Sequence, residues 1–511
     1  MRLSKTTPLI LLLLLIVAAC KKNRPEGEQL DFNTMVQDEV TFTVNPSGKA
    51  PLTALLELKA EEPSIVEVTV EGDAPLTRTS EQYGFQQAYP VLGLYQGNNT
   101  VTVKVIDDRG NYGSQSFTVT TDSLPDFMPE PSMVAVNEPM MAEGWNFCEV
   151  SIGTGGVFKS YPIVVDQNGD IRWALDCFDY PGIMFPWRLL SNGHLMSGVY
   201  ENLYEFDWMG YEVRTLPIPG YLVHHEIQEM PNGNLLVAVD KMGLSTIEDH
   251  IIEISPNGQL IQEWDMREIL DMKRQDLVPD TMDWFHMNAI FYSESDDCLI
   301  ISGRNQGIVK VNRANELQWI LAPHKGWGKA GIDGNGHETS DYLLTAVDGS
   351  GQPYPAAVQE GTTLHPDFDW SWGQHTPMLL DNGNIFVYDN GFNRTFIPQN
   401  PTYSRAVEYR VNADQMTVQQ SWQYGESRGT ELYSPIISDV DVLSNDNRMM
   451  TSGIMFDPNQ PYARVVEVTY PDKAVASELN LNFKNQLGSG TFAWGEFDIC
   501  YRAERVDFSD L

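Results

Sequence analysis

Histidine is the residue type whose positions in this chain point most directly to chemistry. The chain has nine histidines. His225 (with His224 beside it), His286 and His375 each lie on the strand that leads into a turn, and the strand after that turn is rich in Leu, Met, Ile and Val. The three places match one another in separate parts of the chain. We therefore expect imidazoles from different structural units to meet at one site.

Arg304 lies on the strand that follows the His286 turn, in "CLIISGRNQ", and is expected to reach the same site. Histidines with one guanidinium suit an oxyanion held by several donors, and a histidine can itself accept a transferred group on nitrogen. A zinc site of three histidines is an alternative, although a fixed cation such as Arg304 is electrostatically unfavourable beside Zn²⁺. Neither a serine nucleophile elbow (GxSxG) nor a GxxxxGK[ST] phosphate-binding loop is present. No matched pair of carboxylates indicates glycoside hydrolysis.

A weak internal repeat from about residue 133 onward predicts how these residues are positioned. Turns that lead into a strand often ending in Trp, as in "QNGDIRWAL", alternate with turns such as "PNGNLLVAV" and "DNGNIFVYD". Two hairpins per unit make four strands per unit, and such units stack radially into a β-propeller. We predict an all-β protein with a six-bladed β-propeller over residues 126–511. Matching positions in the blades then face the central channel.

The N-terminal part of the chain is predicted to contain a targeting segment and a small domain. Residues 1–20 combine two basic residues, an apolar stretch and small residues directly before Cys20, which resembles a bacterial lipoprotein signal with Cys20 as the lipidated residue. Residues 21–30 are read as a linker. Residues 31–125 show short alternating strands separated by turns, a pattern typical of an immunoglobulin-like β-sandwich. We therefore expect a lipid-anchored protein of the bacterial cell envelope, in the periplasm or at the outer membrane.

Charge and cysteine content limit the partners and the covalent structure. Asp and Glu number 70 against 33 Lys and Arg, which gives a formal charge of −37. Nucleic acid is therefore not expected as a partner, because phosphate binding needs a positive field. Once Cys20 is lipidated, four cysteines remain. A disulfide between Cys148 and Cys500 near the two ends of the propeller is one alternative, and free buried thiols are the other.

Three strings together resemble one protein family. "HHEIQEMPNGN", "WFHMNAIFY…DDCLIISGRNQ" and "GQHTPMLLDNGNIFVYDNG", in this order, are similar to the bacterial aryl-sulfate sulfotransferases, and "NPSGKAPLTA" is similar to that family's N-terminal domain. The resemblance covers nearly the whole chain after the signal. It implies a six-bladed propeller with a histidine-rich channel and transfer of a sulfuryl group from one phenol ester to another phenol. It also implies independence from 3′-phosphoadenosine 5′-phosphosulfate and no cofactor or metal.

The resemblance also implies a role for each residue of the site. His375 is similar to the transiently sulfated nucleophile of the family, which implies ping-pong kinetics. His225, His286 and Arg304 are similar to the residues that hold the sulfuryl oxygens and assist proton transfer, and Asn288 is expected to bind substrate. His225 is preferred to His224 as the channel-facing residue. Three tryptophans are candidates for stacking on aryl rings, although propeller tryptophans are more often core: Trp284, Trp370 and Trp372.

The partners follow from this assignment, and other functions stay open. The expected partners are a phenolic sulfate donor, a phenolic acceptor and, through the lipid anchor, a membrane. The sequence does not decide the oligomeric state, and a homodimer is one option. Two further functions remain as alternatives: a surface-anchored propeller that binds a ligand without turnover, and a metal-dependent hydrolase of sulfate or phosphate esters.

Overall fold

The structure, a computed structural model, describes residues 27–398, 403–457, 460–485 and 494–509. The predicted signal at 1–20, the lipidated Cys20 and most of the linker at 21–30 lie outside the described residues. No helix among the described residues is long and apolar enough to cross a membrane. Strands are the main regular element of the described chain and its helices are all short, which confirms the all-β class.

The N-terminal domain is one six-stranded antiparallel sheet that encloses its own apolar core. Its long strand β2 pairs with β1 and β4 through its first half and with β3 and β5 through its second half. β2 therefore joins both layers of the domain. The elements are η1 (Phe32–Thr34), β1 (Thr41–Val44), β2 (Ala54–Val70), β3 (Leu76–Thr79), β4 (Gly84–Val91), β5 (Asn98–Asp107) and β6 (Tyr112–Thr120).

The rest of the described chain forms six further sheets, here called ring sheets 1 to 6. Ring sheet 1 contains β8 (Trp145–Thr154), β9 (Val157–Ser160), β10 (Ile163–Val165), β11 (Ile171–Ala174) and β33 (Ile499–Val506). Ring sheet 2 contains β12 (Trp187–Leu189), β13 (Leu195–Val199), β14 (Asn202–Phe206) and β15 (Glu212–Pro217). Ring sheet 3 contains β16 (Tyr221–Glu229), β17 (Leu235–Lys241), β18 (His250–Ile254) and β19 (Leu260–Asp265).

The second half of the ring follows the same plan. Ring sheet 4 contains β20 (Met287–Ser293), β21 (Cys298–Gly303), β22 (Gly307–Asn312) and β23 (Leu317–Leu321). Ring sheet 5 contains β24 (Thr345–Ala346), β25 (His375–Leu379), β26 (Asn384–Asp389), β27 (Arg405–Asn412) and β28 (Thr417–Tyr424). Ring sheet 6 contains β7 (Glu130–Val136), β29 (Asp439–Val442), β30 (Arg448–Met455), β31 (Tyr462–Val468) and β32 (Val475–Asn482). The short helices are η2 (Glu138–Met140), α1 (Met266–Ile269), η3 (Thr339–Tyr342), α2 (Ala356–Gln359), η4 (Arg394–Phe396) and η5 (Glu426–Leu432).

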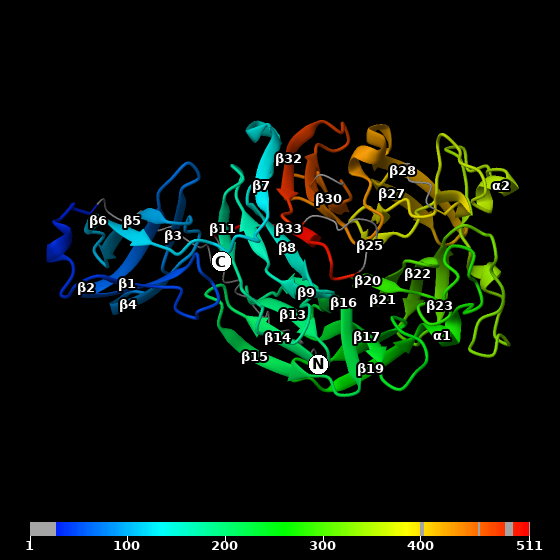
Figure 1. Ribbon diagram of the computed structural model, residues 1–511, viewed down its shortest axis with the longest axis horizontal. Coiled ribbons are helices and arrows are strands. Elements are labelled where there is room, and N and C mark those ends of the chain that lie inside the picture. Colours follow the sequence, from blue (N-terminus) through cyan, green and yellow to red (C-terminus); the bar gives the residue numbers. More distant parts are fainter. Residues whose placement is uncertain (1–26, 399–402, 458–459, 486–493, 510–511) are drawn as a thin grey trace, which may run out of the picture.

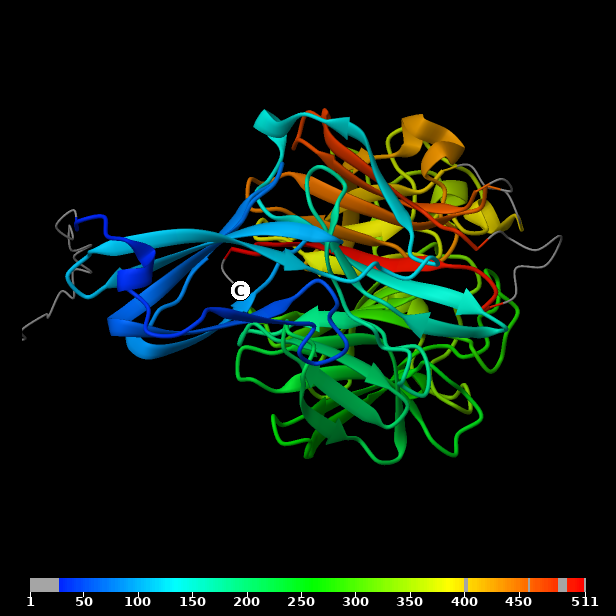
Figure 2. The same cartoon turned by 60° about the vertical axis from the view of Figure 1, so that its left-hand side comes forward.

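Buried apolar residues join each ring sheet to the next, and ring sheet 6 to ring sheet 1. Each sheet thus buries both of its faces, which is the packing of a β-propeller. Strands from distant parts of the chain close the ring: β33 pairs with β8, and β7 pairs with β32. Figure 1 shows these sheets arranged around a centre, with the blue N-terminal domain to one side, and Figure 2 shows the same arrangement from a second direction.

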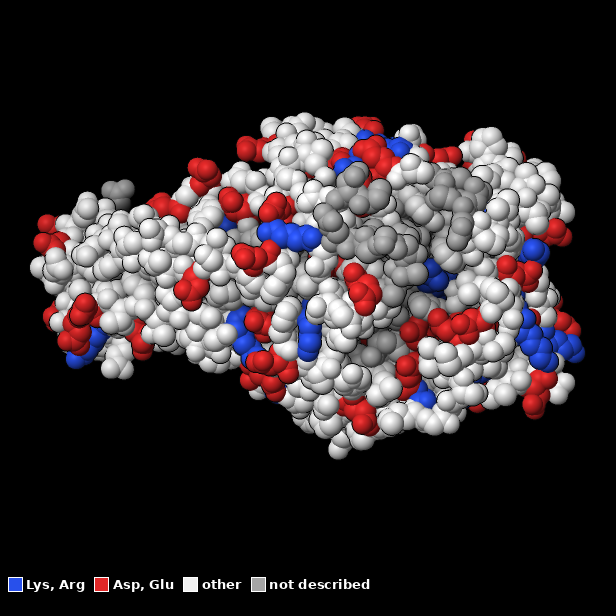
Figure 3. All heavy atoms as spheres, viewed as in Figure 1, with Lys and Arg blue, Asp and Glu red and all other residues white. Residues whose placement is uncertain are grey.

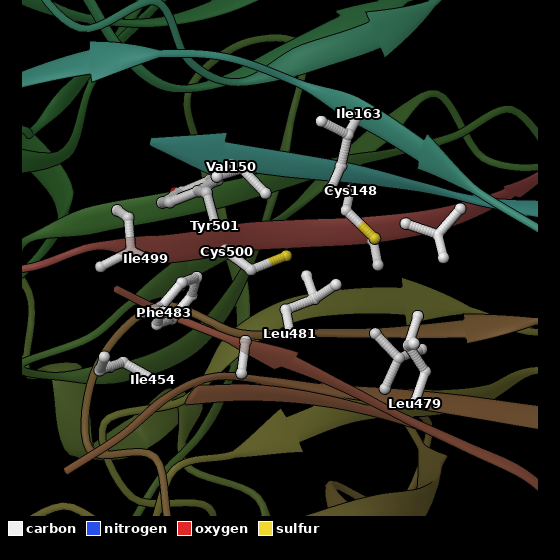
Figure 4. Packing of buried hydrophobic residues seen from close by; sticks show 14 of the residues in the cluster. Cys148, Val150, Ile163, Ile454, Leu479, Leu481, Phe483, Ile499, Cys500 and Tyr501 are labelled. Carbon is white, nitrogen blue, oxygen red and sulfur yellow. The ribbon is translucent and has the colours of Figure 1, made fainter. Parts of the chain in front are cut away.

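Cys148 and Cys500 lie on the two strands that close the ring, β8 and β33. Figure 4 shows their sulfur atoms among the apolar side chains packed between ring sheets 1 and 6. All four described cysteines are free buried thiols in the structure. A hydrogen bond with Cys148, together with burial, holds the pKa of the Cys500 thiol well above its usual range. The structure therefore has the second alternative, free thiols.

The innermost strands of ring sheets 3, 4 and 5 share an irregularity that simple strand alternation does not anticipate. The pairing register shifts between Val223 and Ile227 in β16, between Met287 and Ala289 in β20, and between His375 and Met378 in β25. A bulge of this kind bends the strand and turns a side chain to a new direction. In all three sheets it falls at the histidines, at the inner edge of the ring.

Candidate active site

His375 begins β25 and is 2% exposed. Its Nδ1 lies 2.7 Å from Oδ1 of the buried Asn390. The Asn390 amide nitrogen donates to the carbonyls of Ser434 and Ile437, at 2.8 and 2.9 Å. Because the amide nitrogen is committed as a donor, Oδ1 must be the acceptor, and Nδ1 of His375 must carry the proton. The lone pair of the neutral imidazole is therefore on Nε2.

The surroundings of His375 keep it neutral. Burial lowers its pKa most, and the nearby Arg304 lowers it further. The hydrogen bond with Asn390 acts in the opposite direction, but the pKa stays well below the usual value because His225 and His286 also lower it. A neutral imidazole with one free nitrogen in an enclosed site has the properties of a nucleophile.

Arg304 is a buried cation without a carboxylate partner among the described residues. It follows directly after β21, in the turn to β22, rather than on the strand itself. It is 9% exposed, its Nη2 donates to the Pro435 carbonyl at 3.2 Å, and its guanidinium lies 4.3 Å from the centre of the Phe392 ring. Its Nε has no hydrogen-bond partner within the described part of the chain. A buried charge is normally paired, so this guanidinium has unused capacity for an anion.

His286 comes directly before β20, with its backbone in the left-handed region (φ 54°). Its Nδ1 lies 2.6 Å from Oδ2 of Asp283 and 3.0 Å from Oε2 of Glu248. Burial would lower the pKa of His286, but the two carboxylates outweigh it and raise the pKa to about 9. His286 is therefore an imidazolium at neutral pH, in contrast to His375. Nε2 is the nitrogen left to face a substrate.

His225 is the member of the His224–His225 pair that joins the other imidazoles. Its ring centre lies 5.2 Å from that of His286, and its Nδ1 lies 2.8 Å from the hydroxyl of Tyr501 on β33. His225 has a left-handed backbone (φ 51°). His224 instead places Nε2 3.5 Å from a carboxylate oxygen of Asp240, and burial lowers its pKa. The structure thus brings together His225, His286, His375 and Arg304.

Asn288 supports the site through the backbone. Its amide nitrogen donates to the carbonyl of Gln374, the residue before His375, at 2.8 Å. This bond fixes the start of β25 on ring sheet 4. The Asn288 Oδ1 is buried and has no hydrogen-bond partner among the described residues, so it remains available as an acceptor.

The three candidate stacking tryptophans belong to the apolar core instead. Trp284, Trp370 and Trp372 are each 1% exposed, and their indole nitrogens donate to protein acceptors. Their core role agrees with the general tendency of propeller tryptophans. Aromatic rings that contact the site residues include Phe392, beside Arg304, and two rings against His225: Tyr501, which is stacked on it, and Phe185, which meets it edge to face.

Sequence reasoning missed several residues that contact the site: Asn390, Glu248, Asp283, Tyr501 and Phe392. One of them had a signal. Asn390 directly follows β26, just as Arg304 directly follows β21, so the two occupy the same place in adjacent sheets. The repeat that aligned the histidines could have identified Asn390. Glu248 and Tyr501 reach the site from a loop and from the C-terminal strand, where no repeat marks them.

Two overlapping groups of residues place possible metal ligands within 4.8 Å of one another: His224, His225 and Glu248, and Glu248, Asp283 and His286. The second group does not fit a metal ion in its present geometry. Two atoms bound to one tetrahedral Zn²⁺ lie about 3.3 Å apart, whereas Nδ1 of His286 and Oδ2 of Asp283 are 2.6 Å apart. That distance is typical of a charge-assisted hydrogen bond. In the first group both nitrogens of His224 lack a hydrogen-bond partner among the described residues, so its geometry is the more open of the two.

A cavity of about 400 Å³ lies farther along the same inner strands. Its lining includes Arg188 and five carboxyl groups, those of Glu226, Glu229, Asp439, Asp441 and Glu504. Burial raises the pKa of Glu226 to about 7 and that of Asp441 to about 6. Arg502 binds both Glu226 and the carbonyl of His225, and so separates this cavity from the imidazoles. The cavity is too acidic to favour an anion, which leaves the imidazole side as the anion site.

The family model described as "Arylsulfotransferase (ASST)" matches residues 111–489, and the one described as "Arylsulfotransferase Ig-like domain" matches residues 41–122. The arylsulfate sulfotransferase AssT of Escherichia coli O6:H1 is 30% identical, over 86% of this chain and 89% of that protein. AssT of Lelliottia amnigena is also 30% identical, over 86% of this chain and 90% of that protein. The immunoglobulin-like N-terminal domain is thereby confirmed.

Proposed function

The chain belongs to the arylsulfotransferase family, and we propose that it transfers a sulfuryl group from a phenolic sulfate ester to a phenolic acceptor through a sulfated His375. The observation that carries the proposal is the pairing of a neutral, oriented His375 with the unpaired cation Arg304. An aryl sulfate offers both of the matching parts, an electrophilic sulfur and anionic oxygens. The family match supports a sulfotransferase with small phenolic substrates.

The charge of the site supports an anionic substrate in spite of the charge of the protein. The chain carries a formal charge of −37, and acidic residues are spread over the face shown in Figure 3. At the imidazoles, however, Arg304 is cationic and the raised pKa of His286 makes it cationic as well. The buried Arg304 and the partly buried His286 hold the sulfuryl oxygens where charge develops during transfer, as in the related phosphoryl transfer.

The transfer proceeds in two balanced half-reactions. Nε2 of His375 attacks sulfur in line, the N–S bond forms, and the S–O bond to the first phenol breaks. Nδ1–H keeps its hydrogen bond to Asn390 throughout, so the sulfated ring is an imidazolium that offsets the sulfonate charge. A second phenol then loses its proton as its oxygen forms the new S–O bond and the N–S bond breaks. This sequence is ping-pong and requires neither a nucleotide sulfate donor nor a cofactor.

The test is transfer from 4-nitrophenyl sulfate to phenol, followed by the release of 4-nitrophenol. We expect release that depends on the acceptor, parallel lines in a two-substrate kinetic analysis, and a mass increase of one sulfuryl group after treatment with donor alone. His375→Ala should lose the mass increase and essentially all transfer. Acceptor-dependent release without any protein adduct would rule out the sulfated histidine. Binding of aryl sulfate without release, across several donors, would favour the non-catalytic alternative.

We also propose that Cys20 is lipidated and holds the protein at the bacterial cell envelope. The basic, apolar and small-residue order of residues 1–20 supports this assignment. Cys20→Ala should move the protein from the membrane fraction to the soluble fraction and leave transfer activity unchanged. Equal membrane retention of the variant would contradict the anchor.

A further inference from the structure

We propose that Glu248 and Asp283 are positioning residues that hold His286 as the acid of the reaction: His286 gives a proton to the departing phenol oxygen and takes one from the acceptor phenol. This inference rests on the proposed sulfuryl transfer. It assigns separate roles to two histidines that the sequence pattern treats as equivalent. Neither Glu248 nor Asp283 is among the residues that the family resemblance implies.

The geometry around Nδ1 of His286 carries the first step. Asp283 Oδ2 and Glu248 Oε2 lie 2.6 and 3.0 Å from this one nitrogen. The hydrogen bond to Asp283 requires a proton on Nδ1, because a carboxylate only accepts hydrogen bonds, and Glu248 Oε2 adds its negative charge as an ion-pair contact without hydrogen-bond geometry. Nδ1 is therefore fully used by the protein, and the exchangeable proton of the imidazolium is the one on Nε2.

The backbone fixes both carboxylates in place. The carbonyl of Glu248 accepts a hydrogen bond from the amide of Met287, the residue after His286, at 2.8 Å, and its own amide donates to a side-chain oxygen of Asp240 at 2.6 Å. Glu248 has a left-handed backbone (φ 55°), a conformation that non-glycine residues rarely adopt without local constraint. The carbonyl of Asp283 accepts a hydrogen bond from the side-chain amide nitrogen of Asn305, the residue after Arg304, at 2.7 Å.

The charged and titratable groups that face His286 come from every neighbouring element. They are Glu248 from the segment before β18, Asp283 from its own segment, His225 from β16, Arg304 after β21 and His375 from β25. Only the two carboxylates favour a positive imidazole, and they are also the two in direct contact. Glu248 additionally lies 3.4 Å from Nε2 of His225, so its loss affects His225 as well, whereas Asp283 is specific to His286.

The proton follows a closed cycle. As the S–O bond of the donor breaks, the phenol oxygen takes the Nε2 proton, and His286 becomes neutral with Nδ1–H still bound to the carboxylates. In the second half-reaction the acceptor phenol gives its proton to Nε2 while its oxygen bonds to sulfur. His286 is again an imidazolium, and no proton is gained or lost over the two steps.

The experiment measures kcat/KM for the donor against pH in Asp283→Asn, Glu248→Gln and the wild type, with phenyl sulfate and 4-nitrophenyl sulfate as donors. The wild type should lose activity on the alkaline side near pH 9, where His286 loses its proton. Each variant removes one negative charge next to Nδ1, so the alkaline limb should move to lower pH by about one unit or more. The loss should be greater for phenyl sulfate, because the poorer leaving group depends more on a proton. Glu263 on β19 has a carboxylate that binds Lys241, and Glu263→Gln is the matched control. It should leave the acid and alkaline limbs of the kcat/KM profile at the wild-type pH.

Two results would overturn the inference. The first is an alkaline limb that stays within about 0.3 pH units of the wild type in both variants, with an unchanged leaving-group dependence. The second is wild-type activity that a chelator abolishes and Zn²⁺ restores, because Nδ1 would then bind metal. If neither variant folds, the wild type alone provides the test. Equal losses of kcat/KM at alkaline pH for the two donors would contradict an acid that protonates the leaving group. Failure of the proposed function would be distinct, since the wild type would then show neither the sulfuryl adduct nor acceptor-dependent release.

Discussion

Removal of the Asn390 side chain tests whether the protein selects the reactive form of His375. Asn390→Ala deletes the acceptor that holds the proton on Nδ1, so the imidazole is free to rotate and to carry its proton on Nε2. In that form the lone pair faces away from the substrate. A serine protease whose catalytic histidine is held in the wrong tautomer loses about 10⁴ in kcat. We expect a fall of about 10²–10⁴ in kcat for transfer from 4-nitrophenyl sulfate to phenol.

The same variant has a structural cost that must be separated from the catalytic one. The carbonyls of Ser434 and Ile437 lose their donor. An unsatisfied buried acceptor costs about 1–3 kcal/mol, so the free energy of unfolding should fall by about 2–6 kcal/mol, less if water enters the space. Denaturant unfolding measures this quantity.

Asn447→Ala is the matched control. The Asn447 amide nitrogen also donates two hydrogen bonds, both at 2.7 Å, to the carbonyl of Met140 and to a side-chain oxygen of Glu467, and the residue is 5% exposed. It lies outside the site, so its loss should reduce stability similarly and leave kcat unchanged. A folded Asn390→Ala protein with kcat within threefold of the wild type would refute the tautomer argument.

Three further predictions concern the surroundings of His375. Arg304→Gln removes a cation that lowers the pKa of His375, so that pKa should rise. Because the neutral imidazole reacts, the acid limb of kcat/KM should move to higher pH, and kcat/KM at the optimum should fall by about 10²–10³. An acid limb that does not move would contradict the effect of Arg304 on the pKa of His375. Tyr501→Phe removes the two contacts of the hydroxyl with His225, to Nδ1 at 2.8 Å and to the carbonyl at 3.4 Å, and should cost less than about tenfold in kcat/KM, so a loss above a hundredfold would assign Tyr501 a direct catalytic role. Asp389→Asn removes one of the two carboxylates, Asp369 and Asp389, that the buried Arg394 and Arg405 share, and the free energy of unfolding should fall by about 3–5 kcal/mol in denaturant melts; a change below 1 kcal/mol would show that Asp369 is a sufficient partner.

The fold class and the register of the site were predictable because both depend on local patterns that repeat. Turn residues and alternating apolar strands recur from sheet to sheet, so the position of His375 relative to its turn could be compared with those of His225 and His286. Arg304 was expected on the strand after the His286 turn, and it comes directly after that strand, β21.

The direction of individual side chains was not predictable in this way. Strand alternation places neighbours such as His224 and His225 on opposite faces, but β16 is irregular between Val223 and Ile227. A bulge depends on how the strand fits its neighbours and not on the residues of one strand alone. The choice between His224 and His225 therefore needed the structure, in which His225 contacts His286 and Tyr501.

By itself, the sequence determined which residue types line the inner edge of the ring, because a repeating pattern of turns and strands fixes equivalent positions along the chain. Only the tertiary structure decided their chemical states. Arg304 keeps an Nε that has no hydrogen-bond partner among the described residues. The proton on Nδ1 of His375 depends on Asn390, and the raised pKa of His286 depends on Glu248 and Asp283. These partners lie on other strands and loops and follow no repeat that includes them all. The pKa of a side chain reflects burial and the charges within a few ångströms in space, and distance along the chain does not determine either one.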